Sequence, residues 1–420
     1  MKDRPPTDGA SLRGLRCLLE VAECGSVTAG AIALARTQTA VTKAIQALEN
    51  ALGQRLLDRH PTGVSPTPAG HSVMRRARAA ADELALAARQ LPARGHRHGP
   101  PNAPILSMNI GDRSAHTFIR AVETVDIGAT AQAMGVTPTA VRKTLRTLSG
   151  PLPVPLFETG SSGRFQPTAF AATVARHLKM ALAEARFVLA DLDALGGNLR
   201  GTVSIGTVPF VRTAVVPDVL AGFLASNPAV TVRTHEAPYE QLELSLRGGD
   251  IDFVVGALHA PSALHDVEAL PYIDAPVGIV VRADHPLAHS RRISANDIAR
   301  HGWIMPPEHA PTRSAFEALL RQAGLQPPPH VHVTSSYALR RGLLMESDMI
   351  AVSPLPEFHY ELRLGSLVAL TPAFDGIDRT HLQGNRANIV VRRRSTMTPS
   401  AGRCLDAFLS ARQRWSTPPA

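Results

Sequence analysis

The chain has 420 residues, 44% of them hydrophobic and 19% charged, so it can build cores for two to four domains. It has no apolar run of about 18 residues, which excludes a membrane-spanning helix, and residues 1–10 lack the apolar stretch of a secretory signal. The net charge of +9 is uneven, because residues 1–195 hold 23 Lys and Arg against 15 Asp and Glu. We expect a polyanion partner for this part, with a solvated basic surface as the alternative.

The rarer residue types exclude several classes of protein. Cys17, Cys24 and Cys404 show no metal-binding or redox spacing, and they fit a reducing cytoplasm. Aromatic residues make up only 4% of the chain, which argues against a single-strand nucleic-acid platform built on base stacking. The HExxH, GxSxG and P-loop motifs are also missing from the sequence. We therefore expect no catalytic residues, no cofactor and no bound metal.

Three short helices are predicted near the N-terminus. Gly25 ends the first, and Ser26 and Thr37 are suited to cap the second and third, because hydroxyls accept hydrogen bonds from free N–H groups. In the third helix, residues 40, 41, 44, 45 and 48 are apolar and share one face. The other face carries short polar or basic side chains that suit a DNA major groove, where a solvated face would usually carry Glu and Lys pairs. These side chains are Gln38, Thr39, Thr42, Lys43 and Gln46.

After these helices the sequence predicts a Gly- and Pro-marked hairpin at residues 60–70, suited to a wing, and then a long amphipathic helix from Ala69 to Leu91. Residues 21–70 closely resemble the winged helix-turn-helix of LysR-type transcriptional regulators. The family pattern has an aromatic residue where this chain has Leu18, and it often has Pro where Thr39 stands. The resemblance implies a DNA-binding unit over residues 11–91, whose contacts include Thr37, Arg59 and the polar face of the third helix.

The recognition segment occurs twice in the chain. Residues 37–48 read TQTAVTKAIQAL and residues 137–148 read TPTAVRKTLRTL, with six of the twelve positions identical. Other matches keep this offset of 100 residues up to the hairpin and an offset of 101 beyond it, and a second long helix is predicted over 169–195. We infer a duplicated winged helix-turn-helix at 105–196, joined to the first by the Pro-, Gly- and His-rich linker 92–104.

The second copy departs further from the family pattern than the first. Thr159 stands where the first copy has Arg59, and Ala171 stands where it has Gly70. Its recognition helix is nevertheless more basic, and its candidate DNA contacts are Thr139, Arg142, Lys143 and Arg146. Either this copy also binds DNA, with more weight on phosphates, or it is a structural relic that packs against the first. We favour DNA contact, because a relic needs no cations on that face.

From Gly201 onward the chain alternates predicted strands and helices, with strands at 202–208, 251–258 and 387–393 among others. Residues 200–415 resemble the effector-binding half of the same family, which is similar to periplasmic binding proteins. Within them, residues 208–228 look like the branch of sugar-binding-protein-gene regulators. We therefore expect an α/β fold overall: two mainly helical winged units, followed by a two-lobed, periplasmic-binding-protein-like α/β effector domain.

The resemblance also implies a small-molecule site in the cleft between the two lobes, at strand C-termini and helix N-termini. Several hydroxyls and one strong cation favour a small acid, either a sugar acid or an aromatic acid, over a bare sugar. Helix capping alone could explain any single one of these hydroxyls. The candidate effector contacts are Thr207, Pro209, Thr213, Arg313, Ser314, Ser335, Ser336 and Ser353.

Two classes of function stay open. The leading interpretation is a cytoplasmic transcription regulator, not an enzyme, that binds double-stranded promoter DNA under the control of a small molecule. The alternative is a small-molecule binding protein or enzyme that carries a degenerate, non-DNA-binding helix-turn-helix pair. In the family one long helix per chain pairs antiparallel with its twin, so helices 69–91 and 169–195 could pair between chains or within one. A homo-oligomer, dimer or tetramer, is favoured because the effector half of the family also supplies an interface.

Overall fold

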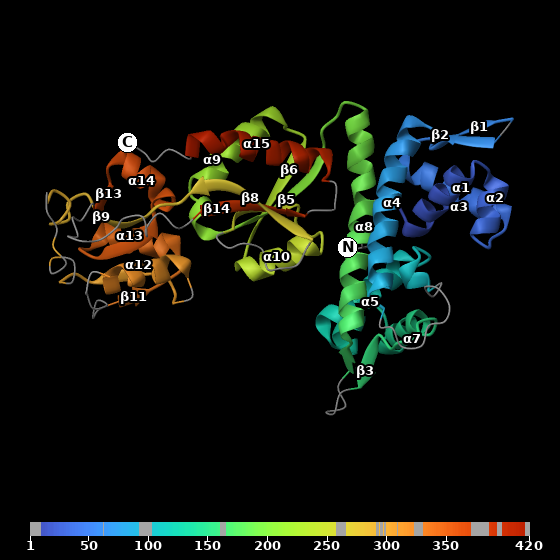
Figure 1. Ribbon diagram of the computed structural model, residues 1–420, viewed down its shortest axis with the longest axis horizontal. Coiled ribbons are helices and arrows are strands. Elements are labelled where there is room, and N and C mark those ends of the chain that lie inside the picture. The colour runs from blue at the N-terminus through green and yellow to red at the C-terminus, as the bar shows by residue number, and fades with distance from the viewer. Residues whose placement is uncertain are drawn as a thin grey trace. The chain divides into compact units, whose positions relative to one another are not determined.

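The computed structural model describes residues 10–61, 63–91, 103–159, 165–257, 266–290, 294, 297, 300–308, 310–322, 331–370, 386–392 and 397–415. The chain divides into two compact units, the first made of Met1–Gly201 with Arg247–Asp250 and the second of Thr202–Leu246 with Ile251–Ala420 (Figure 1). Most of the predicted linker 92–104 lies outside the described residues. Within the described ranges, no helix is long and apolar enough to cross a bilayer.

The first winged helix-turn-helix forms where the sequence predicts it. Its elements are α1 (Leu12–Cys24), α2 (Val27–Ala33), α3 (Gln38–Leu52), β1 (Leu57–His60), β2 (Gly63–Pro66) and α4 (Pro68–Arg89). Gly25 ends α1 with a φ of 63°, a left-handed conformation that a residue without a Cβ adopts freely. Ser26 and Thr37 cap α2 and α3 as predicted, because their hydroxyl oxygens accept backbone N–H groups of the first helical turn.

The second copy repeats these elements in the same order. They are α5 (Asp112–Thr124), α6 (Ile127–Met134), α7 (Pro138–Ser149), β3 (Phe157–Thr159), β4 (Phe165–Pro167) and α8 (Ala169–Leu195). Thr137 caps α7 through the N–H of Ala140 at 3.2 Å, the same distance that separates Thr37 from the N–H of Ala40 in α3. The predicted duplication is therefore confirmed, element by element.

The long helices α4 and α8 pack against each other in antiparallel directions (Figure 1). Arg76, in the first half of α4, meets Asp191 near the end of α8. Glu83, in the second half of α4, meets His177 near the start of α8. One apolar core of buried residues runs through both copies, so the two winged helices form a single unit. This within-chain pairing is one of the two arrangements that the sequence leaves open.

A buried ion cluster lies between α4 and α8. Arg76 donates through Nε and Nη2 to the two carboxylate oxygens of Asp191, at 2.7 and 2.9 Å, and through Nη1 to Glu184 at 2.8 Å. The side chains of Arg76 and Glu184 are only 3% and 1% exposed, and the guanidinium also lies 5.2 Å from the ring centroid of Phe187. Charges so far from water are tolerated only when other groups replace their hydration. Here the guanidinium and the two carboxylates do so for one another through three hydrogen bonds.

The second unit contains two five-stranded sheets with helices around them, as an α/β effector domain requires. One sheet has the order β6 (Val230–Glu236), β5 (Gly201–Thr207), β7 (Phe253–Ala257), β14 (Arg386–Arg392) and β8 (Val267–Asp274). The other has the order β11 (Val331–Val333), β10 (Trp303–Met305), β12 (Ile350–Pro354), β9 (Val277–Arg282) and β13 (Leu367–Leu370). In each sheet parallel pairs, such as β5 with β7, lie beside antiparallel ones.

Shorter elements connect these sheets. They are η2 (Pro209–Val211), α9 (Val215–Ser226), α10 (Tyr239–Arg247), α12 (Pro311–Gln322), α13 (Tyr337–Glu346), η3 (Leu355–Phe358), α14 (His359–Leu364) and α15 (Pro399–Trp415). The strand β8 is missing from the sequence prediction, because Pro271 and flanking acidic residues interrupt its apolar pattern. The pairing of β8 with β14 shifts register beside Pro271, and this irregularity accommodates a residue that has no N–H donor.

The ion cluster predicts a large loss of stability for Arg76→Met. Removing the cation takes the guanidinium away from the buried carboxylates of Glu184 and Asp191, which costs about 3–5 kcal/mol. We expect hydrogen exchange of the α4 and α8 amides to report an opening free energy that is lower by this amount. Arg78→Met is the matched control on α4, because its pair with Glu23 is about half exposed and is worth about 0–1 kcal/mol. Equal effects of the two substitutions would contradict the assignment.

Candidate DNA-binding surface and effector site

The predicted DNA-facing side of α3 points away from the core. Val41, Ile45 and Leu48 are buried on one side of the helix, while Ala40, which the sequence places with them, is exposed. Because the helix sits on the core through this apolar row, its polar row is left free for a partner. Of the candidate contacts in this copy, Thr42 is half-buried and the others are exposed: Thr37, Gln38, Thr39, Lys43, Gln46 and Arg59.

The hairpin of the first copy is held against the helices by hydrogen bonds to backbone groups. The hydroxyl of Thr67 accepts the N–H of Gly70 at 2.9 Å and donates to the carbonyl of Arg55 at 2.8 Å. The N–H of Val64 donates to the carbonyl of Gly25 at 2.9 Å, so the wing rests on the turn before α2. At Gly70 a Cβ would lie 2.0 Å from the carbonyl oxygen of Leu56, which explains the glycine in this copy.

The recognition helix of the second copy presents a more basic surface. Val141, Leu145 and Leu148 are buried in the core, and Thr139, Arg142, Lys143 and Arg146 are all exposed on the other side. None of the three cations forms an ion pair within the part of the chain that the structure describes. A row of unneutralised cations on a helix is suited to phosphate contacts. In the view of Figure 1, α3 and α7 lie on the same side of the long helices.

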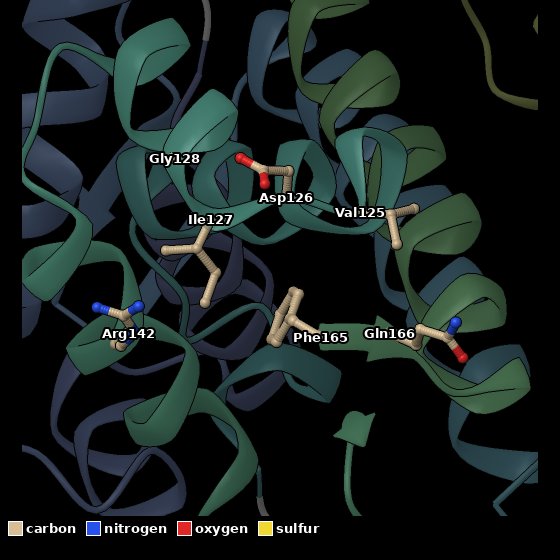
Figure 2. Close-up of a pocket in the computed structure, with 7 residues that line it drawn as sticks. All are labelled: Val125, Asp126, Ile127, Gly128, Arg142, Phe165 and Gln166. Carbon is tan, nitrogen blue, oxygen red and sulfur yellow. The ribbon is translucent and has the colours of Figure 1, made fainter. Parts of the chain in front are cut away.

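The second copy also differs in the turn before its second helix. Figure 2 shows a hollow between the residues Val125–Gly128 at the start of α6, Arg142 of α7, and Phe165 and Gln166 of β4. Val125 has a φ of 53°, the conformation that Gly25 adopts in the first copy, and a β-branched residue is strained there. The second copy thus keeps the helix-turn-helix geometry without the glycine that favours it.

In the effector domain, Thr207 occupies the C-terminal end of the parallel strand β5. Its side chain is 1% exposed, and among the described residues its hydroxyl has no hydrogen-bond partner. Ligands of open α/β sheets bind at such strand ends, and an unpaired buried hydroxyl is costly unless something satisfies it. Pro209, another candidate, begins the 3-10 turn η2 directly after this strand.

A buried polar network that the sequence did not predict links the two lobes. Arg340 on α13 donates to Glu357 at 2.8 Å and to Ser353 at 3.3 Å, and Ser353 donates to the other carboxylate oxygen of Glu357. The hydroxyl of Thr213, which follows the first lobe's strand β5, donates to the carbonyl of Glu357 at 2.7 Å. Burial raises the pKa of the Glu357 carboxyl, and the guanidinium of Arg340 opposes this shift.

The structure brings together only some of the predicted effector contacts. Thr213 and Ser353 meet at the network around Glu357, where their hydroxyls already donate to protein acceptors. Arg313 forms an ion pair with Glu317 one turn along α12, at 2.7 Å, so its charge is partly neutralised. Ser336 caps α13 through the N–H of Leu339. Ser314 and Ser335 are exposed. Arg340 and Glu357 were missed because their chain positions, 17 residues apart, form no recognisable motif.

Comparison with known protein families agrees with this architecture. A model of the LysR substrate binding domain matches residues 196–413, which is more than half of the chain. A model of the bacterial regulatory helix-turn-helix of the lysR family matches twice, at residues 12–71 and 113–172. The two winged helices and the two-lobed domain are therefore those of a transcription regulator. The chain belongs to the LysR family.

Two individual relatives are named as transcriptional regulators. The chain is similar to the HTH-type transcriptional regulator GalR of Pseudomonas putida, with 32% identity over 88% of this chain and 90% of GalR. It is 26% identical to the HTH-type transcriptional regulator GbpR of Azospirillum brasilense, over 57% of this chain and 70% of GbpR. A full-length OxyR variant from Pseudomonas aeruginosa aligns with a TM-score of 0.47 and 17% identity, covering 73% of this chain and 98% of that structure.

The protein is thus a DNA-binding transcription regulator of the LysR type, with helix-turn-helix units in its N-terminal part and an effector-binding domain in its C-terminal part. The alternative, a binding protein or enzyme that carries a degenerate helix-turn-helix pair, receives no support from these relatives.

Proposed function

We propose that the first winged helix reads base edges in a major groove of promoter DNA. The observation that supports this role is the exposed row of short polar side chains on α3, anchored by the buried row behind it. Gln38 can form two hydrogen bonds to an adenine edge, and Lys43 can reach a guanine or a phosphate. Because its DNA partner is promoter DNA, we propose that the protein acts in the cytoplasm, where thiols such as its free cysteines stay reduced.

The second winged helix is proposed to contact the same DNA, chiefly through phosphates. Its support is the row of exposed cations Arg142, Lys143 and Arg146, which has no carboxylate partner among the described residues. A copy kept only for packing would have no need of cations on its outer face. In this arrangement α3 would supply most of the base readout, and α7 would supply most of the electrostatic attachment to phosphates.

The proposed effector is a small hydroxylated or aromatic acid bound between the two lobes. The observation that supports this site is the buried hydroxyl of Thr207, which lacks a hydrogen-bond partner in the part of the chain that the structure describes. Thr213, Ser353 and the start of α13 with Ser335 and Ser336 remain proposed contacts. Pro209, Ser314 and Arg313 are proposed as outer members, and a ligand carboxylate would have to compete with Glu317 for Arg313. Binding there can be coupled to lobe closure, because the Glu357 network already joins the lobes.

Gln38→Ala is expected to relax sequence preference at one base pair. Losing the paired hydrogen bonds should weaken binding to the preferred duplex by about 1–3 kcal/mol and leave random DNA nearly unaffected. Competition binding with duplexes selected from a random library by the full-length protein measures both affinities. Gln54→Ala, beyond the end of α3, is the control and should change neither. An equal loss on selected and random DNA would show that Gln38 does not read a base.

Arg142→Ala is expected to weaken DNA binding regardless of sequence. Each phosphate contact contributes about 0.9 to the slope of log affinity against log salt, so the slope should fall by about that amount. Titrations at several salt concentrations measure it. Arg120→Ala removes an exposed cation from α5 that pairs with Glu123, and it should leave the slope unchanged. If both variants keep the wild-type slope, the second copy does not contact phosphates at this position.

Thr207→Val tests the effector site. A valine has the same shape without the hydroxyl. Because this hydroxyl has no hydrogen-bond partner among the described residues, folding stability should not decrease. Losing one hydrogen bond should nevertheless reduce effector affinity by about tenfold. Calorimetry of the full chain against a panel of sugar acids and aromatic acids measures the affinity. Thr202→Val, exposed on the same strand, is the matched control. Unchanged affinity in Thr207→Val would place the site elsewhere.

A further inference from the structure

We propose that the two winged helices of a single chain close on each other as one two-headed DNA-binding unit, which covers two half-sites of different sequence. The inference rests on the proposed function in one respect, namely that both copies contact DNA. It goes further in assigning the pairing of the long helices to one chain. A regulator with one winged helix per chain needs two chains for the same arrangement, and its half-sites are then related by symmetry.

The contacts between α4 and α8 have an internal two-fold pattern. At the offset of 101 residues, His177 is the counterpart of Arg76, and Glu184 is the counterpart of Glu83. Arg76 meets Glu184, and His177 meets Glu83 at 2.7 Å, so the two side-chain contacts are equivalent under exchange of the copies. This exchange pattern is the one that an isologous dimer interface requires. The chain therefore contains both halves of a dimer-like interface.

Two sequence differences make the mixed pairing better than either self-pairing. Asp191 is the counterpart of Gln90, so only the second copy offers two carboxylates to its partner. In a pair of first copies from two chains, Arg76 would face Glu83 and the neutral Gln90. In a pair of second copies, a histidine would face the two carboxylates. Only the mixed pair places the guanidinium against Glu184 and Asp191 together, with the three hydrogen bonds that the structure contains.

The segment that enters the second copy is also bound to the first copy. Ile105 is fully buried in the shared core, and the 3-10 turn Pro104–Leu106 packs against α4. The side-chain oxygen of Asn109 accepts a hydrogen bond from Arg36 at 2.6 Å, and the backbone carbonyl of Asn109 accepts one from Arg13 at 3.3 Å. Chain entry into the second copy is thus fastened to the first copy before the second set of helices begins.

Chain connectivity favours the same outcome. Only the residues 92–102 separate the last described residue of the first copy from Ala103, which is completely buried. A short tether holds the two halves at an effective concentration on the order of millimolar, far above the concentration of a second chain in solution. Closure within one chain is therefore favoured over exchange between two. It also leaves the effector domains free to supply any contact between chains.

Cross-linking distinguishes closure within a chain from exchange between chains. In a Cys24→Ser background, Glu83→Cys and His177→Cys place thiols at two positions whose wild-type side chains are in contact. The remaining cysteines, Cys17 and Cys404, are buried. A short bismaleimide should join them, and the product should migrate as a monomer with the mass of one chain plus one linker. Glu83→Cys alone is the control and should give no cross-linked species.

A covalent dimer from the double variant would overturn closure within one chain. The same conclusion would follow if both thiols reacted singly and were never joined, because α4 and α8 would then not be paired. Circular dichroism verifies that the variant is folded. Should it misfold, the footprint described next tests the proposal with substitutions on exposed residues, which leave the α4–α8 interface intact.

Footprinting tests the two unlike half-sites directly. Duplexes selected from a random library by the full-length protein are probed with hydroxyl radicals in the presence of wild type, Gln38→Ala or Arg142→Ala. Each variant should lose protection over one half-site only, and the two variants should affect opposite halves, by severalfold at limiting protein. If one variant weakens both halves equally and the other weakens neither, every half-site is held by the same copy from two chains. If each variant weakens both halves equally, both copies contribute to every half-site. Either result would overturn the proposal.

The two proposals fail in distinguishable ways. A chain that cross-links internally but enriches no duplex would overturn the proposed DNA contacts and the assignment of half-sites, while closure itself would stand. A chain that binds DNA but forms covalent dimers would overturn closure and leave the DNA contacts intact.

Discussion

The pairing of Arg76 with Glu184 and Asp191 is the interaction on which the N-terminal unit depends. Three charges buried between two helices would be strongly unfavourable without one another, and their hydrogen bonds satisfy the guanidinium only when α4 and α8 are antiparallel and in one register. Sliding either helix by one turn would leave buried charge unpaired. Apolar packing between Ala-rich helices tolerates several registers, so the ion cluster selects one of them. The positions of both recognition helices follow, because each is joined to its long helix through a hairpin.

Duplication within one chain removes a constraint that identical subunits cannot escape. In a homodimer every change to a recognition helix appears in both half-sites, whereas here α3 and α7 can diverge separately. The structure contains this divergence in two places. On the outer side of the recognition helices, Arg142 stands where the first copy has Thr42, and in the long helices His177 stands where the first copy has Arg76. The scaffold has stayed alike, as the identical capping distances of Thr37 and Thr137 indicate.

The effector domain relies on a comparable buried network. Glu357 receives hydrogen bonds from Arg340 and Ser353 on its carboxylate and from Thr213 on its carbonyl, and these groups come from both lobes. Burial raises the pKa of the Glu357 carboxyl, and its hydrogen-bond partners hold this side chain in place. A ligand that moves one lobe must rearrange these hydrogen bonds. The contact between the lobes at Thr213 and the proposed effector site at Thr207 are close together in the chain, since Thr213 follows Thr207 by six residues.

The sequence by itself determined what local interactions decide. The structure contains three local features as predicted: the hydroxyl caps at Ser26 and Thr37, the glycine stop at Gly25 and the repeat offset. The caps and the stop depend on groups only a few residues apart, and the offset depends on matching positions in the two copies. Polar and apolar rows on α3 were likewise readable from helical periodicity, apart from the exposed Ala40. Only the tertiary structure decided that α4 and α8 of one chain pack together, that Arg76 is buried, and that Glu357 joins the lobes. These contacts link residues up to 144 positions apart, and their energies depend on how the folded protein buries and pairs the groups, which no local pattern encodes.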